Sequence, residues 1–360
     1  VSCHVHGDDR TPENPTHIER GTRPRPLPAR TFMSMLSDMF ARMPPTRRQY
    51  LARAAGVGSG VTAGVSAGCL GDTSPAGPRF TLRIGSKGFD EQRILGYLAY
   101  HSLRDLERVR LVDRIGRGDT QTNWAGVRDG TIDLYWEYTG TVWGRLPPVR
   151  DERIMDPRAV YERAAADARD QGVAMAPPAD FSNEYVLVTD AAWSRDTGVE
   201  TIGDLLAYAS AAERAVPVAV NGAFYHRRDG WPGLFDHYDA DPAARASLSG
   251  DALTVTSIGL TYELLASGDA TVANGFASDP QLDRDGIVTL DDDGGYFLPY
   301  NPAPTAHAPT VDAHPAVFTA LEPVVDALSE PAMRRLNRRV FVDGELPSAV
   351  AESFLSAEVR

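Results

Sequence analysis

Residues 80–92 read FTLRIGSKGFDEQ, and this stretch decides the class of fold. Its first six residues alternate between apolar and polar side chains, which is typical of a β-strand. A short Gly/Ser loop follows, and from Asp90 to Leu106 the apolar residues recur at helical spacing. A strand that passes through a tight loop into a helix is the first unit of a layered α/β fold.

The alternation of strand and helix patterns continues through the rest of the chain. The expected strands lie at 109–115, 132–135, 173–175, 184–189, 216–220, 253–256, 271–273 and 305–308. The expected helices lie at 120–128, 157–171, 201–208, 230–238 and 259–267, with three more between 313 and 355. This alternation predicts α/β layers with mainly parallel sheets.

The length of the alternating region predicts two lobes. About 280 residues exceed what one hydrophobic core ordinarily serves, so we expect the chain to build two cores. We place a crossing between the lobes near Pro177 and a return crossing near Ser278. The first lobe then comprises residues 80–177 and 278–360, and the second comprises residues 178–277.

Composition excludes several classes of protein. Of the 360 residues 42% are apolar, which is typical of a globular chain, and the net charge of −13 argues against a nucleic-acid partner. Cys3 and Cys69 are too few for a disulfide scaffold, and after residue 70 no apolar stretch is long enough for a multi-spanning membrane protein. Lys87 is the single lysine among 36 basic residues. This acidic, arginine-rich composition suits a halophilic protein that stays soluble in strong salt, although a GC-rich genome would produce the same arginine bias.

The first 68 residues have the features of an export signal behind a disordered, Pro- and Arg-rich extension. Residues 46–51 read TRRQYL, a weakly apolar run extends from Ala54 to Ala67, and Cys69 follows the small residues at its end. This order resembles a twin-arginine (Tat) lipoprotein signal, in which the cysteine thiol accepts the lipid. We therefore expect lipidation at Cys69, a tether at 69–79, and an extracytoplasmic protein held at the cell membrane by its N-terminal lipid only. The alternative is a Gly/Ala-rich linker with a chance cysteine.

Three local stretches could carry binding chemistry. Residues 84–92 place Lys87 beside the free N–H groups of a helix start, an arrangement that binds anions, although an ordinary capped helix start has the same residues. Residues 133–141 read DLYWEYTGT and end a strand in aromatic and hydroxyl side chains, at the strand end where α/β proteins bind ligands. Residues 296–304 read YFLPYNPAP, and prolines on both sides of Tyr300 make a rigid segment that could present the ring to a cleft.

Together these stretches carry a family resemblance. From residue 80 to residue 355 the chain resembles the substrate-binding proteins of ABC importers for glycine betaine, proline betaine and choline. The matching motifs, in the family's order, are Gly85-Ser86-Lys87 with Glu91-Gln92, Glu137-Tyr138-Thr139-Gly140-Thr141, Asn183-Glu184-Tyr185, Arg227 with Asp229-Gly230, and Leu298-Pro299-Tyr300. The resemblance implies a two-lobed periplasmic-binding-protein fold of type II with two hinge crossings. It also implies a solute-binding protein rather than an enzyme, with no cofactor and no metal.

The resemblance implies an aromatic cage for a quaternary ammonium group. Such a group donates no hydrogen bond, and aromatic ring faces hold it through cation–π attraction. The family's cage positions correspond here to Tyr138, Tyr185, Phe276 and Tyr300. Phe276 stands where a tyrosine is common in the family, so this wall of the cage lacks a hydroxyl group.

The resemblance also implies a site for the carboxylate of a betaine, which needs charge-assisted donors once it is buried. The family's positions correspond to Lys87, Thr141 and Arg227, and Asn183 and Tyr225 are further candidates for the cleft. Because Lys87 lies in the expected first lobe and Arg227 in the second, the ligand should close the cleft by bridging them. Asn183 stands where some members have aspartate, which removes one negative charge near the cation.

Several functions and ligands stay open at this point. The implied partners are a small quaternary ammonium ligand and ABC permease subunits, or a chemotaxis transducer to which the loaded protein presents its ligand. An enzyme that uses the cleft is a remote alternative, because the sequence has no Walker loop, no zinc-protease motif and no nucleophile elbow. Glycine betaine, proline betaine, carnitine and choline are not distinguished.

Overall fold

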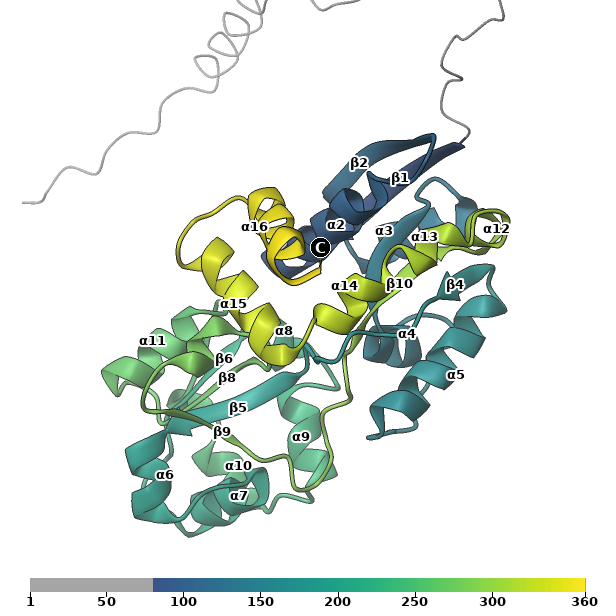
Figure 1. Cartoon of the computed structure of the whole chain (residues 1–360). Helices are drawn as coiled ribbons and strands as arrows, with labels where there is room; N and C mark the ends of the chain where they lie inside the picture. The colour runs from purple at the N-terminus through teal and green to yellow at the C-terminus, as the bar shows by residue number, and fades with distance from the viewer. Residues whose placement is uncertain (1–79, 360) are drawn as a thin grey trace, which may run out of the picture. The chain divides into compact units, whose positions relative to one another are not determined.

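The computed structural model describes residues 80–359. The expected export signal, the lipidation site at Cys69 and the tether lie outside these residues. Residues 80–359 form two lobes, each built on a five-stranded sheet that carries helices (Figure 1). This arrangement confirms the predicted α/β class and the division into two lobes.

The first lobe contains the sheet with the strand order β2-β1-β3-β10-β4. Its strands are β1 (Phe80–Lys87), β2 (Val109–Gly118), β3 (Leu134–Tyr138), β4 (Val173–Met175) and β10 (Pro302–His307). Its helices are α2 (Asp90–Leu103), α3 (Thr120–Asp129), α4 (Thr139–Arg145), α5 (Pro157–Arg169), α12 (Ala308–Ala313), α13 (Ala316–Thr319), α14 (Glu322–Ala327), α15 (Glu330–Phe341) and α16 (Pro347–Phe354), and a π-helical turn, Leu355–Val359, follows.

The second lobe contains the sheet with the strand order β7-β6-β8-β5-β9. Its strands are β5 (Tyr185–Asp190), β6 (Val218–Asn221), β7 (Leu253–Thr256), β8 (Val272–Phe276) and β9 (Ile287–Leu290). Its helices are α6 (Ala191–Thr197), α7 (Ile202–Ala211), α8 (Gly222–His226), α9 (Trp231–His237), α10 (Pro242–Ser247) and α11 (Leu260–Ser267), with 3₁₀ turns at Gly250–Ala252 and Pro280–Asp283.

In each sheet four strands run in one direction and one strand runs in the other. In the first sheet β1 pairs in parallel with β2 and β3, whereas β10 pairs antiparallel with β3 and β4. In the second sheet β6 pairs in parallel with β7 and β8, whereas β5 pairs antiparallel with β8 and β9. The prediction of mainly parallel sheets is therefore confirmed for four strands of each sheet, and it missed the one reversed strand in each, β10 and β5. Strands β5 and β10 each follow a crossing between the lobes, and they enter their sheets in the reverse direction.

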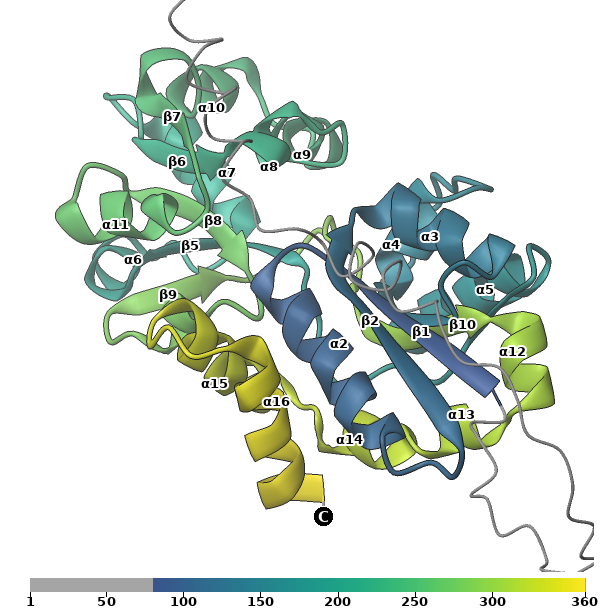
Figure 2. The same cartoon turned by 90° about the horizontal axis from the view of Figure 1, so that it is seen from above.

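Hydrophobic clusters cover both faces of each sheet, which is why the inner strands are largely buried, whereas the edge strands β2 and β7 are half-buried or exposed. In the first lobe Leu134 and Trp136 of β3 belong to one cluster, and Tyr135 between them belongs to another. Helices α2, α14 and α16 lie along one face of this sheet, and α3, α4 and α5 lie along the other (Figure 2). The second lobe likewise has separate clusters on its two faces. Each lobe is therefore a three-layer α/β unit with its own core.

The C-terminal part of the first lobe contains four helices, α13 to α16, where three were expected. A proline occupies one of the first two helical positions of α14, α15 and α16, and Pro315 is the N-cap residue of α13. Proline is favoured at helix starts and breaks helix interiors, so these prolines divide the segment into short helices. Within residues 80–359, no helix has both the length and the apolar composition that a bilayer crossing requires.

The chain crosses between the two sheets twice. It leaves the first sheet after Met175 and joins the second at Tyr185, which agrees with the expected crossing near Pro177. The expected return near Ser278 is too early, because β9 still pairs with β5 in the second sheet. The chain returns between Leu290 and Pro302.

The two crossing segments are hydrogen-bonded to each other. The Ala179 N–H donates to the Pro302 carbonyl at 2.9 Å, and the Asn183 N–H donates to the Tyr300 carbonyl at 3.0 Å. The Tyr300 N–H in turn donates to Ser182 Oγ at 2.9 Å. These bonds fix Tyr300 and Asn183 next to each other at the junction of the lobes.

Candidate functional site

Two predicted cage residues of the second lobe form an aromatic pair. Tyr185 at the start of β5 lies opposite Phe276 at the end of β8 in the antiparallel ladder. Because directly opposed residues point to the same face of a sheet, their rings stack, with centroids 4.7 Å apart and planes 26° apart. The ring of Phe224 packs 4.7 Å from Tyr185 and supports the pair from α8.

Arg227 links this pair to Tyr300. Its guanidinium carbon lies 5.4 Å from the centre of the Tyr185 ring, and its Nη2 donates to the Tyr300 hydroxyl at 3.2 Å. Asp229 accepts from Arg227 Nε at 2.9 Å and also from Nη2. Burial alone would lower the pKa of Arg227, but the hydrogen bond to Asp229 raises it above its ordinary value. Arg227 is therefore a fixed positive charge beside two predicted cage rings.

Lys87 and Tyr138 of the first lobe are close to each other. The Lys87 ammonium donates to Glu137 Oε1 at 2.5 Å, and both side chains are buried. The same ammonium lies 4.8 Å from the centre of the Tyr138 ring. In this structure the lysine expected to bind a ligand carboxylate thus has a carboxylate partner within the protein.

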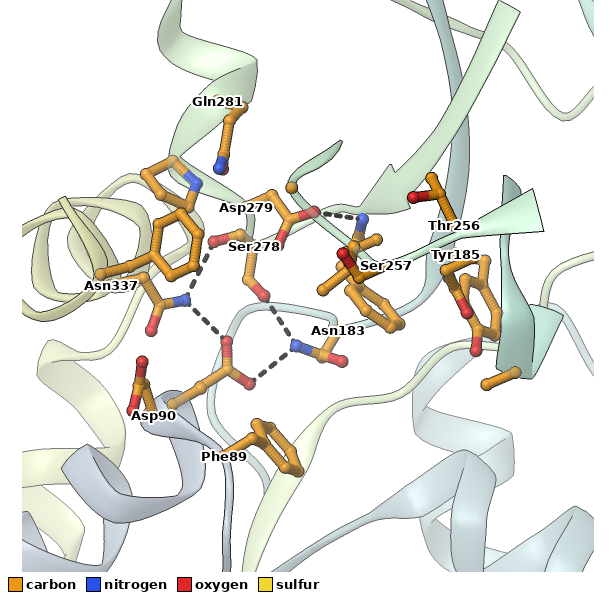
Figure 3. Close-up of a pocket in the computed structure, with 18 of the residues that line it drawn as sticks. Phe89, Asp90, Asn183, Tyr185, Thr256, Ser257, Ser278, Asp279, Gln281 and Asn337 are labelled. Carbon is orange, nitrogen blue, oxygen red and sulfur yellow. Dashed lines mark hydrogen bonds between the residues drawn. The ribbon is translucent and has the colours of Figure 1, made fainter. Parts of the chain in front are cut away.

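A buried carboxylate, Glu91, joins Tyr138 to the crossing. Glu91 Oε1 accepts from the Tyr138 hydroxyl at 2.7 Å and from Asn183 Nδ2 at 3.0 Å. Its Oε2 accepts from Asn337 Nδ2 at 2.9 Å, and Asn183 Nδ2 also donates to Ser278 Oγ at 2.8 Å (Figure 3). Burial and the Glu91 carboxylate both raise the pKa of Tyr138. The network connects α2, the first crossing, the end of β8 and α15.

A cavity of about 510 Å³ lies next to these groups. Of the predicted site residues, Tyr185, Phe276 and Asn183 line it, whereas Lys87, Tyr138, Thr141, Arg227, Tyr225 and Tyr300 do not. The first lobe contributes Phe89 and Glu91 to its lining, and the second contributes Tyr185 and Phe276. Phe89 and Tyr185 are labelled in Figure 3. The cavity is lined mainly by apolar and aromatic surface, with the Asn183 amide at one side. Aromatic faces combined with a buried carboxylate are the chemistry that holds an organic cation.

Within residues 80–359, the side chains of Thr141 and Tyr225, the remaining predicted site residues, form no hydrogen bond or ring contact with those of the other predicted site residues. Thr141 is buried in the first turn of α4. In the same turn, a Cβ on Gly140 would lie 3.1 Å from the Tyr300 ring, so this turn is adjacent to Tyr300. Tyr225 packs against the core of the second lobe, and its ring lies 4.9 Å from that of His226. The structure thus brings together Tyr185, Phe276, Arg227 and Tyr300, and separately Lys87 and Tyr138.

Three residues of the site were not singled out from the sequence as binding residues. Glu137 is an acid within an apolar and aromatic stretch, and an acid in a stretch predicted to be buried is a usable signal. Glu91 stands between Asp90 and Gln92 and carries no such signal. Phe89 is 45% exposed, borders the cavity and stacks with Tyr138 at 6.4 Å between ring centres. An exposed aromatic side chain in a loop has no distinguishing pattern in a single sequence.

The sequence matches a known family along nearly all of the described chain. The model of the substrate binding domain of ABC-type glycine betaine transport systems matches residues 81–357. The glycine-betaine-binding protein of Pseudomonas aeruginosa is 29% identical over 283 residues, which are 76% of this chain and 87% of that protein. The chemotactic signal transduction system substrate-binding protein CosB of Halobacterium salinarum is 28% identical over 275 residues, which are 75% of this chain and 82% of that protein.

Solved structures show the same fold. Apo YehZ from Escherichia coli superimposes with a TM-score of 0.62 at 22% identity, covering 78% of this chain and 98% of that one. A structure described as a glycine betaine/carnitine/choline ABC transporter superimposes with a TM-score of 0.66 at 20% identity, covering 77% and 97%. These likenesses confirm the two-lobed architecture of a periplasmic substrate-binding protein.

Proposed function

The chain belongs to the family of substrate-binding domains of ABC-type glycine betaine transport systems, and from this premise we propose that it captures a quaternary ammonium compatible solute of the glycine betaine type and delivers it to an ABC importer for osmoprotection. Proteins of this family bind solutes and are not enzymes. The proposal adds to the family assignment a ligand chemistry, an aromatic cage and a partner.

One observation carries the ligand chemistry. Arg227 lies against the Tyr185 ring and donates to the Tyr300 hydroxyl, so a cation and two cage rings meet at one point. A betaine presents a methylated ammonium group and a carboxylate a few bonds apart. Ring faces attract the first by roughly 0.5–2 kcal/mol each, and the guanidinium binds the second.

We propose that the bound ligand bridges the two lobes. Tyr138 and Thr141 belong to the first lobe, whereas Tyr185, Phe276 and Arg227 belong to the second. A ligand that touches both sets is bound fully only when the lobes approach, so binding stabilises the closed arrangement. An ABC permease can then recognise the closed form. The Lys87 ammonium has three donors, so it can donate to the ligand carboxylate while it still donates to Glu137. In this way Lys87 joins the carboxylate site.

We further propose an extracytoplasmic location with a lipid at Cys69, exported by the twin-arginine route. The support is the order of residues 46–69, namely twin arginine, weakly apolar run and small residues before a cysteine. Mass spectrometry of the mature protein from membranes tests this proposal. A lipid-modified N-terminal cysteine is expected, and an unmodified chain that begins upstream of residue 69 would contradict it.

A second candidate function is ligand presentation to a chemotaxis transducer. The relative from Halobacterium salinarum carries the name of a chemotactic substrate-binding protein, and its identity to this chain is close to that of the transport relative. Both functions use the same site and the same closure. The neighbouring genes separate them, because import requires a permease and an ATPase, whereas chemotaxis requires a transducer.

Isothermal titration calorimetry with Arg227→Ala tests the carboxylate site. Losing a charge-assisted hydrogen bond costs about 1.5–3 kcal/mol, so the dissociation constant for glycine betaine should rise about 10- to 100-fold. Choline has no carboxylate, and its affinity should change much less. Arg245→Ala is the matched control, because Arg245 also pairs with an aspartate and lies 5.6 Å from the centre of an aromatic ring in the same lobe.

Two results would contradict the proposal in different ways. Equal losses for glycine betaine and choline would remove the carboxylate role from Arg227 but keep the cage. No binding of any betaine, carnitine or choline to the wild-type chain in strong salt would refute the proposed ligand class itself.

A further inference from the structure

We infer that Glu91 supplies the negative charge that faces the ligand's quaternary ammonium group and that it positions Tyr138 and Asn183 for binding. This inference rests on the proposed function and deepens it. It names a residue that determines whether the cavity prefers a cation over a neutral molecule of the same shape. Four segments that are distant in sequence meet at this one carboxylate.

The first step is the state of the Glu91 carboxylate. Its side chain lies in the first turn of α2, and the residue is only 4% exposed. Its three hydrogen bonds come from neutral donors, namely one hydroxyl and two amides. Within residues 80–359 no lysine or arginine forms an ion pair with it, whereas the neighbouring Glu137 is paired with Lys87. Neutral donors satisfy the hydrogen-bond acceptors of a carboxylate without placing an opposite charge beside it.

The second step is the position of that charge. Glu91 lines the cavity together with Phe89, Tyr185 and Phe276, so a carboxylate and aromatic side chains border one space. Figure 3 shows Phe89, Asn183 and Tyr185 around this space. The amide at residue 183 carries no charge, and it donates to Glu91. Two half-buried acids, Asp90 and Asp279, also line the cavity. Asp279 accepts from the Tyr262 hydroxyl and the Phe276 N–H of the second lobe. Glu91 is therefore the carboxylate that joins both halves of the site.

The third step is the effect on Tyr138. Its hydroxyl donates to Glu91 at 2.7 Å, which fixes the orientation of the ring. A phenol that donates to a carboxylate gains electron density, because hydrogen-bonded groups polarise one another in a low-dielectric interior. A more electron-rich ring face attracts a cation more strongly. Glu91 thus acts on the ligand both by its own charge and through the ring that it orients.

The experiment compares charged and neutral ligands of the same shape. Choline carries a positively charged quaternary nitrogen, whereas 3,3-dimethylbutan-1-ol has an uncharged quaternary carbon at the same place and otherwise the same shape. Glu91→Gln in the full-length chain keeps the side-chain size and removes the charge. We expect its affinity for choline to fall about tenfold, which corresponds to 1.4 kcal/mol, with an unchanged affinity for the neutral alcohol. Glu352→Gln, on the exposed face of α16, is the matched control and should change neither affinity.

A second variant moves the charge instead of removing it. In Glu91→Gln with Asn183→Asp the donor and acceptor exchange places, because the new amide at residue 91 can donate to the new carboxylate at residue 183. The present donor and acceptor are 3.0 Å apart. We expect this double variant to regain most of the affinity for choline. A residue with a purely structural role would not be rescued in this ligand-specific way.

The possible results separate the inference from the proposed function. Equal losses for choline and the neutral alcohol, no loss for either, or no rescue by the double variant would overturn the role given to Glu91. Failure of the wild-type chain to bind any quaternary ammonium compound would overturn the inference together with the proposed function. Thermal unfolding of each variant, measured without ligand, shows whether a loss of affinity merely reflects misfolding.

Discussion

At the scale of single residues, the carboxyl group of Asp279 makes the stability of the folded protein depend on pH. It follows β8 and accepts from the Phe276 N–H at 2.8 Å and from the Tyr262 hydroxyl at 3.0 Å. Burial raises the pKa of its carboxyl to about 6, from an ordinary 3.8, and nearby Glu91 adds to the rise, although both hydrogen bonds oppose it. Between these two pH values the folded state holds a proton that the unfolded state has lost. The stability that this carboxyl contributes is therefore present at low pH and is lost as pH rises towards 6.

Replacing Asp279 by asparagine removes this dependence and keeps both acceptor bonds. We compare the unfolding free energies of the variant and the wild type at two pH values. From pH 4.5 to pH 7.5 their difference should change by about 2 kcal/mol in favour of the variant. Urea unfolding of both proteins at the two pH values measures the difference. A stability difference that is the same at both pH values would show that Asp279 is not a buried acid of this kind.

The sequence alone did not predict which residues of the candidate site contact one another. The family resemblance selected Tyr185, Phe276, Arg227 and Tyr300, and these are in contact in the structure. It did not predict that Lys87 would bind Glu137, because the two are 50 positions apart and only the pairing of β1 with β3 brings them together. Hydrogen-bond partners of this kind depend on sheet register, which a single sequence does not encode locally.

At the scale of elements, the start of α4 is pressed against the second crossing. Gly140 lies in its first turn, and a Cβ there would be 2.6 Å from the Pro299 carbonyl oxygen and 3.1 Å from the Tyr300 ring. Only glycine allows this close approach of two backbones. The absence of a side chain at Gly140 therefore allows the helix and the crossing to lie in contact.

Gly140→Ala should displace the crossing segment and with it Tyr300. We expect a loss of about 1–3 kcal/mol in unfolding free energy, together with weaker ligand binding. Gly144→Ala in the same helix is the control, since its Cβ would make only an ordinary contact of 3.6 Å with Leu298. Chemical denaturation and calorimetry of the two variants measure both effects. If the two variants behave alike, the close contact at Gly140 does not position the crossing.

Element boundaries were least predictable where proline interrupts a strand pattern. The sequence indicated a strand at 305–308, whereas β10 begins at Pro302. Proline cannot donate in a ladder and argues against a central strand. Here Pro302 and Pro304 still pair with β3, and their carbonyls accept from the Ala179 and Ala176 N–H groups. The strand tolerates both prolines because β4 pairs only with its later residues, 305–307.

At the scale of the whole molecule, two adjacent crossings connect lobes that have separate cores. Such a connection allows the lobes to rotate about the crossings without repacking either core. The sequence predicted the two lobes from length and strand alternation. It could not place the return crossing, because β9 is a short strand and its membership in the second sheet rests on pairing with β5.

Ligand binding should therefore compact and stabilise the molecule. Small-angle X-ray scattering should show a smaller radius of gyration with saturating glycine betaine or choline than without ligand. The unfolding free energy should rise by about 2.7 kcal/mol at a hundredfold excess over the dissociation constant. Proline, which lacks a quaternary ammonium group, is the control ligand. Stabilisation without compaction would show that the ligand binds one lobe alone.

The single lysine also makes this chain unusually simple to follow by amine chemistry. Lys87 is 7% exposed, and its ammonium is held by Glu137. Apart from the N-terminal amine, Lys87 is therefore the one amine that an acylating reagent can modify. This amine is shielded in the native protein and becomes accessible when the first lobe opens locally. The rate of modification at that position reports the frequency of such opening, with no background from other lysines. Ligand that tightens the cleft should protect this one position.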